Sequence, residues 1–179
     1  PKAIRMASCA SNEAITIGGS SPSPNWDCNN VMDHPPQNVQ SQSGVQGHMF
    51  HGNGFGYTCP DDCTLSFFFA QTEDLAVIEY VNREGGSEWE RIQTWDWYYC
   101  TNGATTEAGC DWTRCPDATS PHGTQACSGG YKGFGDACLY YAFECQVAGV
   151  TAIQMRVLAA TSAINLRSIL AYRLETPDD

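Results

Sequence analysis

The chain has 179 residues, with 20 acidic and 9 basic side chains and a formal net charge of −11. A chain of this length fits one domain, and its negative charge opposes binding to phosphate backbones and anionic lipid headgroups. Nucleic acid and a membrane surface are therefore poor choices of partner.

Strand-like runs dominate the sequence, and clusters of Gly, Pro, Asn and Asp separate them. No window of helical period is long enough for a helical bundle, so we predict a single all-β domain over residues 1–179. The expected strands are 14–17, 64–69, 75–82, 92–99, 138–145, 152–158 and 165–174. The sixth alternates clearly, with Ile153, Met155 and Val157 on one face and residues 154, 156 and 158 on the other.

Two stretches between the expected strands, 18–59 and 100–137, exceed the roughly 12 to 15 residues at which structureless loops become uncommon. In the first, residues 30–33 are expected to form one helical turn that the prolines at 35 and 36 end. The second is a cysteine-rich insert that we expect to be stapled flat. Long loops pinned on a rigid scaffold are typical carriers of recognition.

Ten cysteines in this length predict five disulfides, formed in an oxidising compartment. We therefore expect an extracellular protein, either secreted or on the cell surface. The spacings Cys59-x3-Cys63 and Cys110-x4-Cys115 also fit zinc, but the number of cysteines favours disulfides. The pairing itself does not follow from the sequence.

The stretch TWDWYYC, residues 94–100, allows two registers in a strand. One places Trp95, Trp97 and Tyr99 in the core with Asp96 in solvent, and the other exposes both tryptophans as a functional patch. Because burying Asp96 without a partner would be costly, the first register is favoured. Tyr98 and the far end of the strand are then expected to reach toward the loop surface.

Two loops carry the candidate binding residues. In NREGGSEWER, residues 82–91, Arg83 and Arg91 offer planar hydrogen-bond forks for sugar hydroxyls, and Trp89 offers a stacking surface. A solvated hairpin with weak surface ion pairs is the alternative interpretation. In GHMFHGNGFGYTC, residues 47–59, His51 is expected to contact a hydroxyl and Tyr57 to stack on the sugar.

Several segments resemble the discoidin, or coagulation-factor type C, family. CTLSFFFAQTEDLAVIEYVNREG (63–85) is similar to its central pair of strands, which a short turn joins and an Asn-Arg turn ends. RIQTW (91–95) resembles the strand that follows, and TAIQMRVLAATSAINLRSILAYRL (151–174) resembles the closing pair. NNVMDHPP (29–36) is similar to the NaVDGnp loop of the family. The resemblance covers most of the chain outside the cysteine-rich insert.

The resemblance implies a discoidin-like jelly-roll β-sandwich with long disulfide-stapled loops, shared with F-type lectins and many carbohydrate-binding modules. Members of the family bind sugars, lipids or proteins through loops at one end, and most are not enzymes. Asp33 is the candidate ligand for a structural calcium, although Ser168 replaces the acid common in the last strand. The fucose motif of F-type lectins is not matched, since Gly85 stands in place of its Asp and Arg91 lies one position late.

We predict a non-catalytic module that binds a glycan or glycoprotein and requires no cofactor. The recognised catalytic motifs, such as Gly-x-Ser-x-Gly and His-Glu-x-x-His, do not occur. One alternative is a protein-interaction module of a larger extracellular assembly without a sugar site, which the start at Pro1 and the acidic ETPDD tail would fit. Another is calcium-dependent adhesion through Asp33.

Overall fold

The computed structural model describes residues 1–11, 28–32, 50–51, 63–82, 92–116, 119–125, 140–160 and 165–175. Its elements are β1 (Lys2–Ala3), β2 (Met6–Ser11), the 3-10 helix η2 (Cys28–Val31), β3 (Phe50–His51), β4 (Cys63–Asn82), β5 (Ile92–Cys100), the 3-10 helix η5 (Glu107–Gly109), β6 (Thr113–Arg114), β7 (Gly123–Thr124), β8 (Tyr140–Ala160) and β9 (Asn165–Arg173). The all-β prediction is confirmed. Neither of the two short helices in these ranges has the length or apolar character to cross a bilayer.

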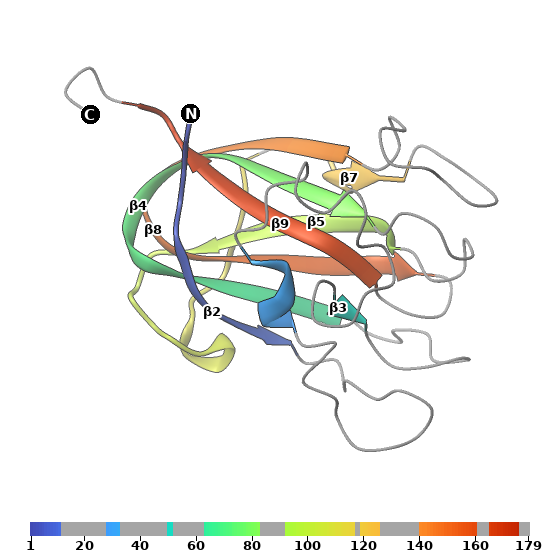
Figure 1. Cartoon of the computed structure of the whole chain (residues 1–179), viewed down its shortest axis with the longest axis horizontal. Helices are drawn as coiled ribbons and strands as arrows, with labels where there is room; N and C mark the ends of the chain where they lie inside the picture. Colours follow the sequence, from blue (N-terminus) through green and yellow to red (C-terminus); the bar gives the residue numbers. More distant parts are fainter. Residues whose placement is uncertain are drawn as a thin grey trace.

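Two long strands, β4 and β8, organise the fold. They pair antiparallel along most of their length, and their register shifts between Phe68 and Val77, where both ribbons curve around one end of the molecule (Figure 1). Each strand therefore contributes to two packed layers. One layer joins β2, the first half of β4, the second half of β8, and β5 with β6 and β7; the other joins β1, β9, β3, the second half of β4 and the first half of β8.

The continuity of β4 and β8 corrects the sequence prediction. We expected four separate strands, with a short turn in the polar run 71–74, and the structure has two bent strands instead. The polar side chains at the bend have partners although the pairing is irregular there: a carboxylate oxygen of Glu73 lies 3.5 Å from Nε of Arg173, and the Asp74 carboxylate accepts a hydrogen bond from the Gly149 backbone. The expected strand at 14–17 lies outside the described residues.

The core lies between the two layers. Ile153, Met155 and Val157 are fully buried, as their alternation predicted, and they lie beside Leu65 and Phe67 of β4. Burial of each such side chain contributes about 1.5 to 3 kcal/mol relative to exposure. On the opposite face of β8, Leu158 is 45% exposed, but Gln154 is only 3% exposed and donates a hydrogen bond to the Ser66 hydroxyl, so the predicted solvent-facing side of this strand is confirmed only in part.

The favoured register of TWDWYYC is confirmed for both tryptophans. Trp95 and Trp97 are each 1% exposed, and Tyr99 packs partly buried against the same core. Tyr98 points to the outer face of the first layer, where the guanidinium of Arg156 lies 3.7 Å above its ring. The cation–π contact, rather than a loop, occupies that face of the ring.

All seven described cysteines are in disulfides. Three pairs are complete within the described residues: Cys9–Cys28, Cys100–Cys110 and Cys115–Cys145. Cys110 and Cys115 therefore belong to different disulfides, which rules out a zinc site between them. The pair Cys9–Cys28 fixes η2, which begins two residues before the helical turn that we expected at 30–33.

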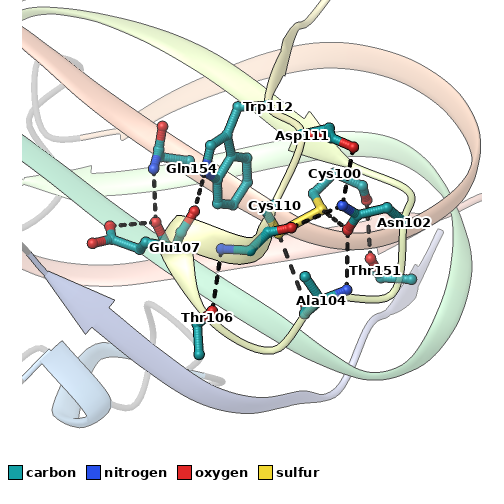
Figure 2. The surroundings of a disulfide bond; sticks show 12 residues. Cys100, Asn102, Ala104, Thr106, Glu107, Cys110, Asp111, Trp112, Thr151 and Gln154 are labelled. Atoms are coloured by element: carbon teal, nitrogen blue, oxygen red, sulfur yellow. Dashed lines mark hydrogen bonds between the residues drawn. A yellow bond between two sulfur atoms is a disulfide. The ribbon is translucent and has the colours of Figure 1, made fainter.

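The Cys100–Cys110 disulfide closes a loop over the outer face of the first layer (Figure 2). Here the Glu107 carboxylate accepts hydrogen bonds from the hydroxyls of Thr64 at 2.8 Å and Ser66 at 2.6 Å. The indole N–H of Trp112 donates to the Glu107 carbonyl at 3.0 Å. Part of the cysteine-rich insert is thus stapled to the sheet, and Glu107 replaces water as the partner of two strand hydroxyls.

Candidate functional site

Several strands begin or end at the side of the sandwich away from the bend and the N-terminus (Figure 1). At this end, Asn82 of β4 pairs with Leu166, Ile92 of β5 pairs with Ala160, and His51 of β3 pairs with Asn165. We call these paired strand ends the rim. The rim is where the chain leaves the scaffold toward the predicted binding loops.

The predicted binding residues attach to the rim, but most lie outside the described residues. Arg83, Trp89 and Arg91 fall between Asn82 and Ile92, whose backbones are both at the rim. Tyr57 follows β3 and lies outside the described residues as well. Only the backbone of His51 is described, as the residue paired with Asn165. Their roles in binding therefore stay predictions.

A pocket of about 330 Å³ opens next to the rim, on the side of the sandwich between β5 and the first half of β8. Its lining comes from three segments: Trp95 and Trp97 of β5, residues 122–124 of the insert, and residues 140–143 of β8. This volume is at the lower end of the range for small-molecule sites. We call it the aromatic pocket.

Aromatic rings from both layers meet at this pocket. Trp95 contacts Tyr80 and Tyr141 edge to face, with ring centroids 5.0 Å apart in each pair. The His122 imidazole lies 4.3 Å from the Phe143 ring, centroid to centroid. Because these rings bridge the insert, β5 and β8, the shape of the pocket depends on all three segments.

The insert segment that closes the pocket is held by Asp96, and here the sequence prediction was wrong. We expected Asp96 in solvent, but its side chain is only 7% exposed. Its carboxylate accepts hydrogen bonds from Arg114 at 3.1 Å, the Ser120 hydroxyl at 2.9 Å and the His122 backbone N–H at 2.8 Å. The acid is buried at low cost because three donors replace its water.

The charge state of Asp96 follows from these contacts. Burial alone would raise the pKa of Asp96, but the hydrogen bonds from Arg114, the His122 backbone and Ser120, together with the Arg114 charge, outweigh burial. The pKa of Asp96 lies below its ordinary value of 3.8 as a result. The carboxylate therefore stays ionised at neutral pH and is compensated by Arg114.

His122 is oriented by a backbone hydrogen bond. Its Nδ1 accepts the N–H of Trp97 at 2.9 Å, so the ring is the neutral tautomer with its proton on Nε2. Nδ1 also lies 3.7 Å from the Asp96 carboxylate. The hydrogen bond from Trp97 is the shorter contact, and it requires an unprotonated Nδ1, because a proton on Nδ1 would displace the Trp97 N–H.

Two residues bear on the predicted calcium site, Ser168 and Asp33. Ser168, at the position where the family commonly has an acid, is a fully buried hydroxyl in β9. Within the described ranges, no three His, Cys, Asp or Glu side chains gather closely enough to hold a metal ion. Asp33 falls outside those ranges, so its role as a calcium ligand stays a prediction.

The sequence prediction missed the pocket residues His122, Gly123 and Thr124. They lie in the insert, which was expected to be irregular but contains β6 and β7, both paired with β5. The sequence did contain a usable pattern. Arg114 and the segment SPHGT (120–124) supply hydrogen-bond donors for a buried Asp96, and the glycine of that segment leaves room for an indole ring. Their place on β5 comes from the pairing of β7 with Thr94 and Trp95, which the sequence does not give.

Comparison with solved structures decides the fold. The lectin domain of lectinolysin, in complex with Lewis B antigen, matches with a TM-score of 0.60 at 12% identity, over 96% of this chain and 95% of that one. The family 32 carbohydrate-binding module of Clostridium perfringens NanJ, in complex with galactose, matches with a TM-score of 0.56 at 12% identity, over 96% and 98%. An F5/8 type C domain from Bacteroides fragilis matches with a TM-score of 0.60 at 8% identity, over 98% and 100%.

The chain has the discoidin fold. The sequence matches no protein-family model and no curated protein, so the likeness rests on structure. At these identities, a discoidin fold fixes the architecture but not the ligand. Within this discoidin-fold domain, the rim lies beside the bases of the predicted binding loops, and the aromatic pocket lies against the cysteine-rich insert.

Proposed function

We propose that this domain is a non-catalytic carbohydrate-binding module that acts outside the cell on a glycan or glycoprotein. The observation that carries the proposal is the rim, where Asn82 pairs with Leu166 and Ile92 pairs with Ala160. Because Leu166 also pairs with Phe50, the base of the 83–91 loop lies across β9 from β3, the strand that contains His51. The residues chosen for sugar contact thus attach to one end of the scaffold.

The proposed contacts divide by chemistry. Arg83 and Arg91 would hold sugar hydroxyls by paired hydrogen bonds, and Trp89 and Tyr57 would stack on the apolar face of the ring. His51 would contact one further hydroxyl. The similar folds of a lectin domain bound to Lewis B antigen and of a module bound to galactose support this ligand class.

The extracellular setting is supported by the disulfides. Every described cysteine is oxidised, and such bonds persist in oxidising compartments. A non-catalytic role is supported by the sequence, which carries none of the recognised catalytic motifs.

A glycan array tests the proposal. The intact oxidised domain is screened with calcium and with chelator, beside the Arg83→Ala/Trp89→Ala double variant. Arg5→Ala is the control, because Arg5 is exposed in the connection between β1 and β2, where its carbonyl accepts a hydrogen bond from Ala70 near the bend, at the opposite end of the sandwich from the rim. We expect selective glycan binding that the double variant loses and Arg5→Ala keeps, with circular dichroism confirming that each protein is folded.

Two results would contradict the proposal. If the folded domain binds no glycan on a broad array, the result favours the protein-interaction module instead. Binding that survives in the double variant would move the sugar site away from the 83–91 loop. The comparison between calcium and chelator tests calcium-dependent adhesion. If glycan binding and thermal stability are the same in both conditions, calcium-dependent adhesion is ruled out.

A further inference from the structure

We propose that the aromatic pocket is a second carbohydrate site, built by the cysteine-rich insert, which takes a single neutral pyranose ring. The proposal shares with the proposed function only the class of ligand. Its residues are Trp95, Trp97, residues 122–124 and residues 140–143, none of which belongs to the predicted loop sites at 51–57 and 83–91.

The size and lining of the pocket point to a sugar ring. A pocket of about 330 Å³ suits a ligand of one or two small rings. The rings of Tyr140, Tyr141 and Phe143 are partly exposed and offer apolar surface on which the C–H face of a pyranose packs, whereas the indoles of Trp95 and Trp97 are buried. The hydroxyl-bearing residues Thr124, Tyr140 and Tyr141 belong to the same lining, so hydrogen-bonding groups for sugar hydroxyls accompany the rings.

The charge of the pocket selects a neutral sugar. None of the described residues that line the pocket carries a formal charge, because His122 is held as the neutral tautomer by the Trp97 N–H. The nearby Asp96 carboxylate is matched by Arg114. The whole chain has a net charge of −11, which would repel an acidic sugar such as a sialic acid.

The pocket is also preorganised. Asp96 fixes the insert through three hydrogen bonds, and the Cys115–Cys145 disulfide ties the same insert to β8 two residues from Phe143. Walls that are held before the ligand arrives lose little conformational freedom on binding. The described insert residues that line the pocket are therefore already fixed in place before a ligand binds.

Two threonines provide a matched test. Thr124 and Thr113 are both exposed, and each lies in a two-residue strand paired with β5, but only Thr124 lines the pocket. Thr124→Trp should fill the mouth of the pocket, while Thr113→Trp places the same indole farther along β5. Both variants are compared with the unmodified domain after circular dichroism and thermal unfolding show that they are folded.

The probes are the methyl glycosides of glucose, galactose and mannose, with N-acetylneuraminic acid as the charged comparison. We expect at least one neutral glycoside to shift the amide resonances of Gly123, Thr124 and Ala142 in a saturable way. Thr124→Trp should weaken this binding by about tenfold or more, and Thr113→Trp should leave it within about twofold. The acidic sugar should bind at least about tenfold more weakly than the best neutral one.

Several results would overturn the inference. These are no shift with any neutral glycoside, equal binding of N-acetylneuraminic acid, or equal losses in the two threonine variants. The Arg83→Ala/Trp89→Ala variant separates the two proposals. If that variant abolishes all glycan binding while Thr124→Trp changes nothing, the proposed function stands and the second site falls; the reverse pattern places the only sugar site in the pocket.

Discussion

Gly123 lies against the ring of Trp95 so closely that a Cβ added to Gly123 would come within 2.0 to 2.4 Å of three indole atoms. Gly123 is not one of the glycines with positive φ, so space and not backbone conformation requires a glycine here. Trp95 cannot move away easily, because Tyr80 and Tyr141 contact it edge to face. The insert and the core therefore meet at this pair.

Gly123→Ala should destabilise the domain by about 1 to 3 kcal/mol, the usual cost of overpacking a filled core. Urea unfolding measures the change. In a Trp95→Phe background the smaller ring leaves space, so the added cost of Gly123→Ala should fall to well under half. If alanine costs the same in both backgrounds, the contact with Trp95 is not the reason for the glycine.

Asp96→Asn should destabilise the domain by about 1 to 3 kcal/mol at pH 7, because Arg114 and two further donors lose a charged acceptor. The pKa of Asp96 is lower in the folded than in the unfolded protein, so its stabilisation is complete above the ordinary pKa of 3.8 and is lost as pH falls through the folded value. Urea unfolding at pH 7 and at successively lower pH should show the gap between wild type and variant closing below about pH 4. Glu144→Gln, on an exposed position of β8, serves as the control. A gap that stays constant across this range would contradict the assignment.

Removing the Cys115–Cys145 disulfide by serine substitution of both cysteines should cost about 2 to 4 kcal/mol, the typical contribution of a native disulfide. The amide resonances of residues 122–124 should shift as well, because this bond ties their segment to β8. The Cys9–Cys28 pair is the matched comparison, since it fixes η2 to β2 instead. Its removal should lower thermal stability but leave residues 122–124 unshifted, and equal shifts in both variants would contradict a local role.

Glu107→Ala should cost about 1 to 3 kcal/mol, because the buried Ser66 hydroxyl and the Thr64 hydroxyl lose their common acceptor. Glu107→Gln keeps an acceptor oxygen of the same shape and should cost less than half as much. Thermal unfolding of the two variants distinguishes the effects. Equal losses would mean that the negative charge, and not the hydrogen bonds, fixes the disulfide loop to the sheet.

The part of the fold that alternation encodes could be predicted from the sequence. The core contains Ile153, Met155, Val157, Trp95 and Trp97, as we expected. In a strand with alternating apolar residues, only one register places all the apolar side chains on the buried face. The bend in β4 was missed because the polar run 71–74 has the composition of a turn. Its neighbours in three dimensions, Arg173 and Gly149, are what allow the strand to continue.

The site was harder to predict for a physical reason. Asp96 was placed in solvent because its partners are not local: Arg114, Ser120 and His122 come from 18 to 26 residues farther along the chain. Strand pairing through β6 and β7 places that segment on β5, and the Cys115–Cys145 disulfide ties it to β8. Ten cysteines allow too many pairings for the sequence to choose among. The loop residues Arg83, Trp89, Arg91, Tyr57 and His51 stay predictions, since none of their side chains lies within the described residues.

The bend that carries β4 and β8 from one layer to the other also bears on how the domain loses its structure. Because the same two strands form the centre of both layers, neither layer can open while the other keeps its pairing intact. The layers should therefore behave as one cooperative unit in native-state hydrogen exchange, with the amides of Phe67 and Ile78 exchanging at the same global free energy. A ligand that stabilises either end of this sandwich would then protect both layers equally.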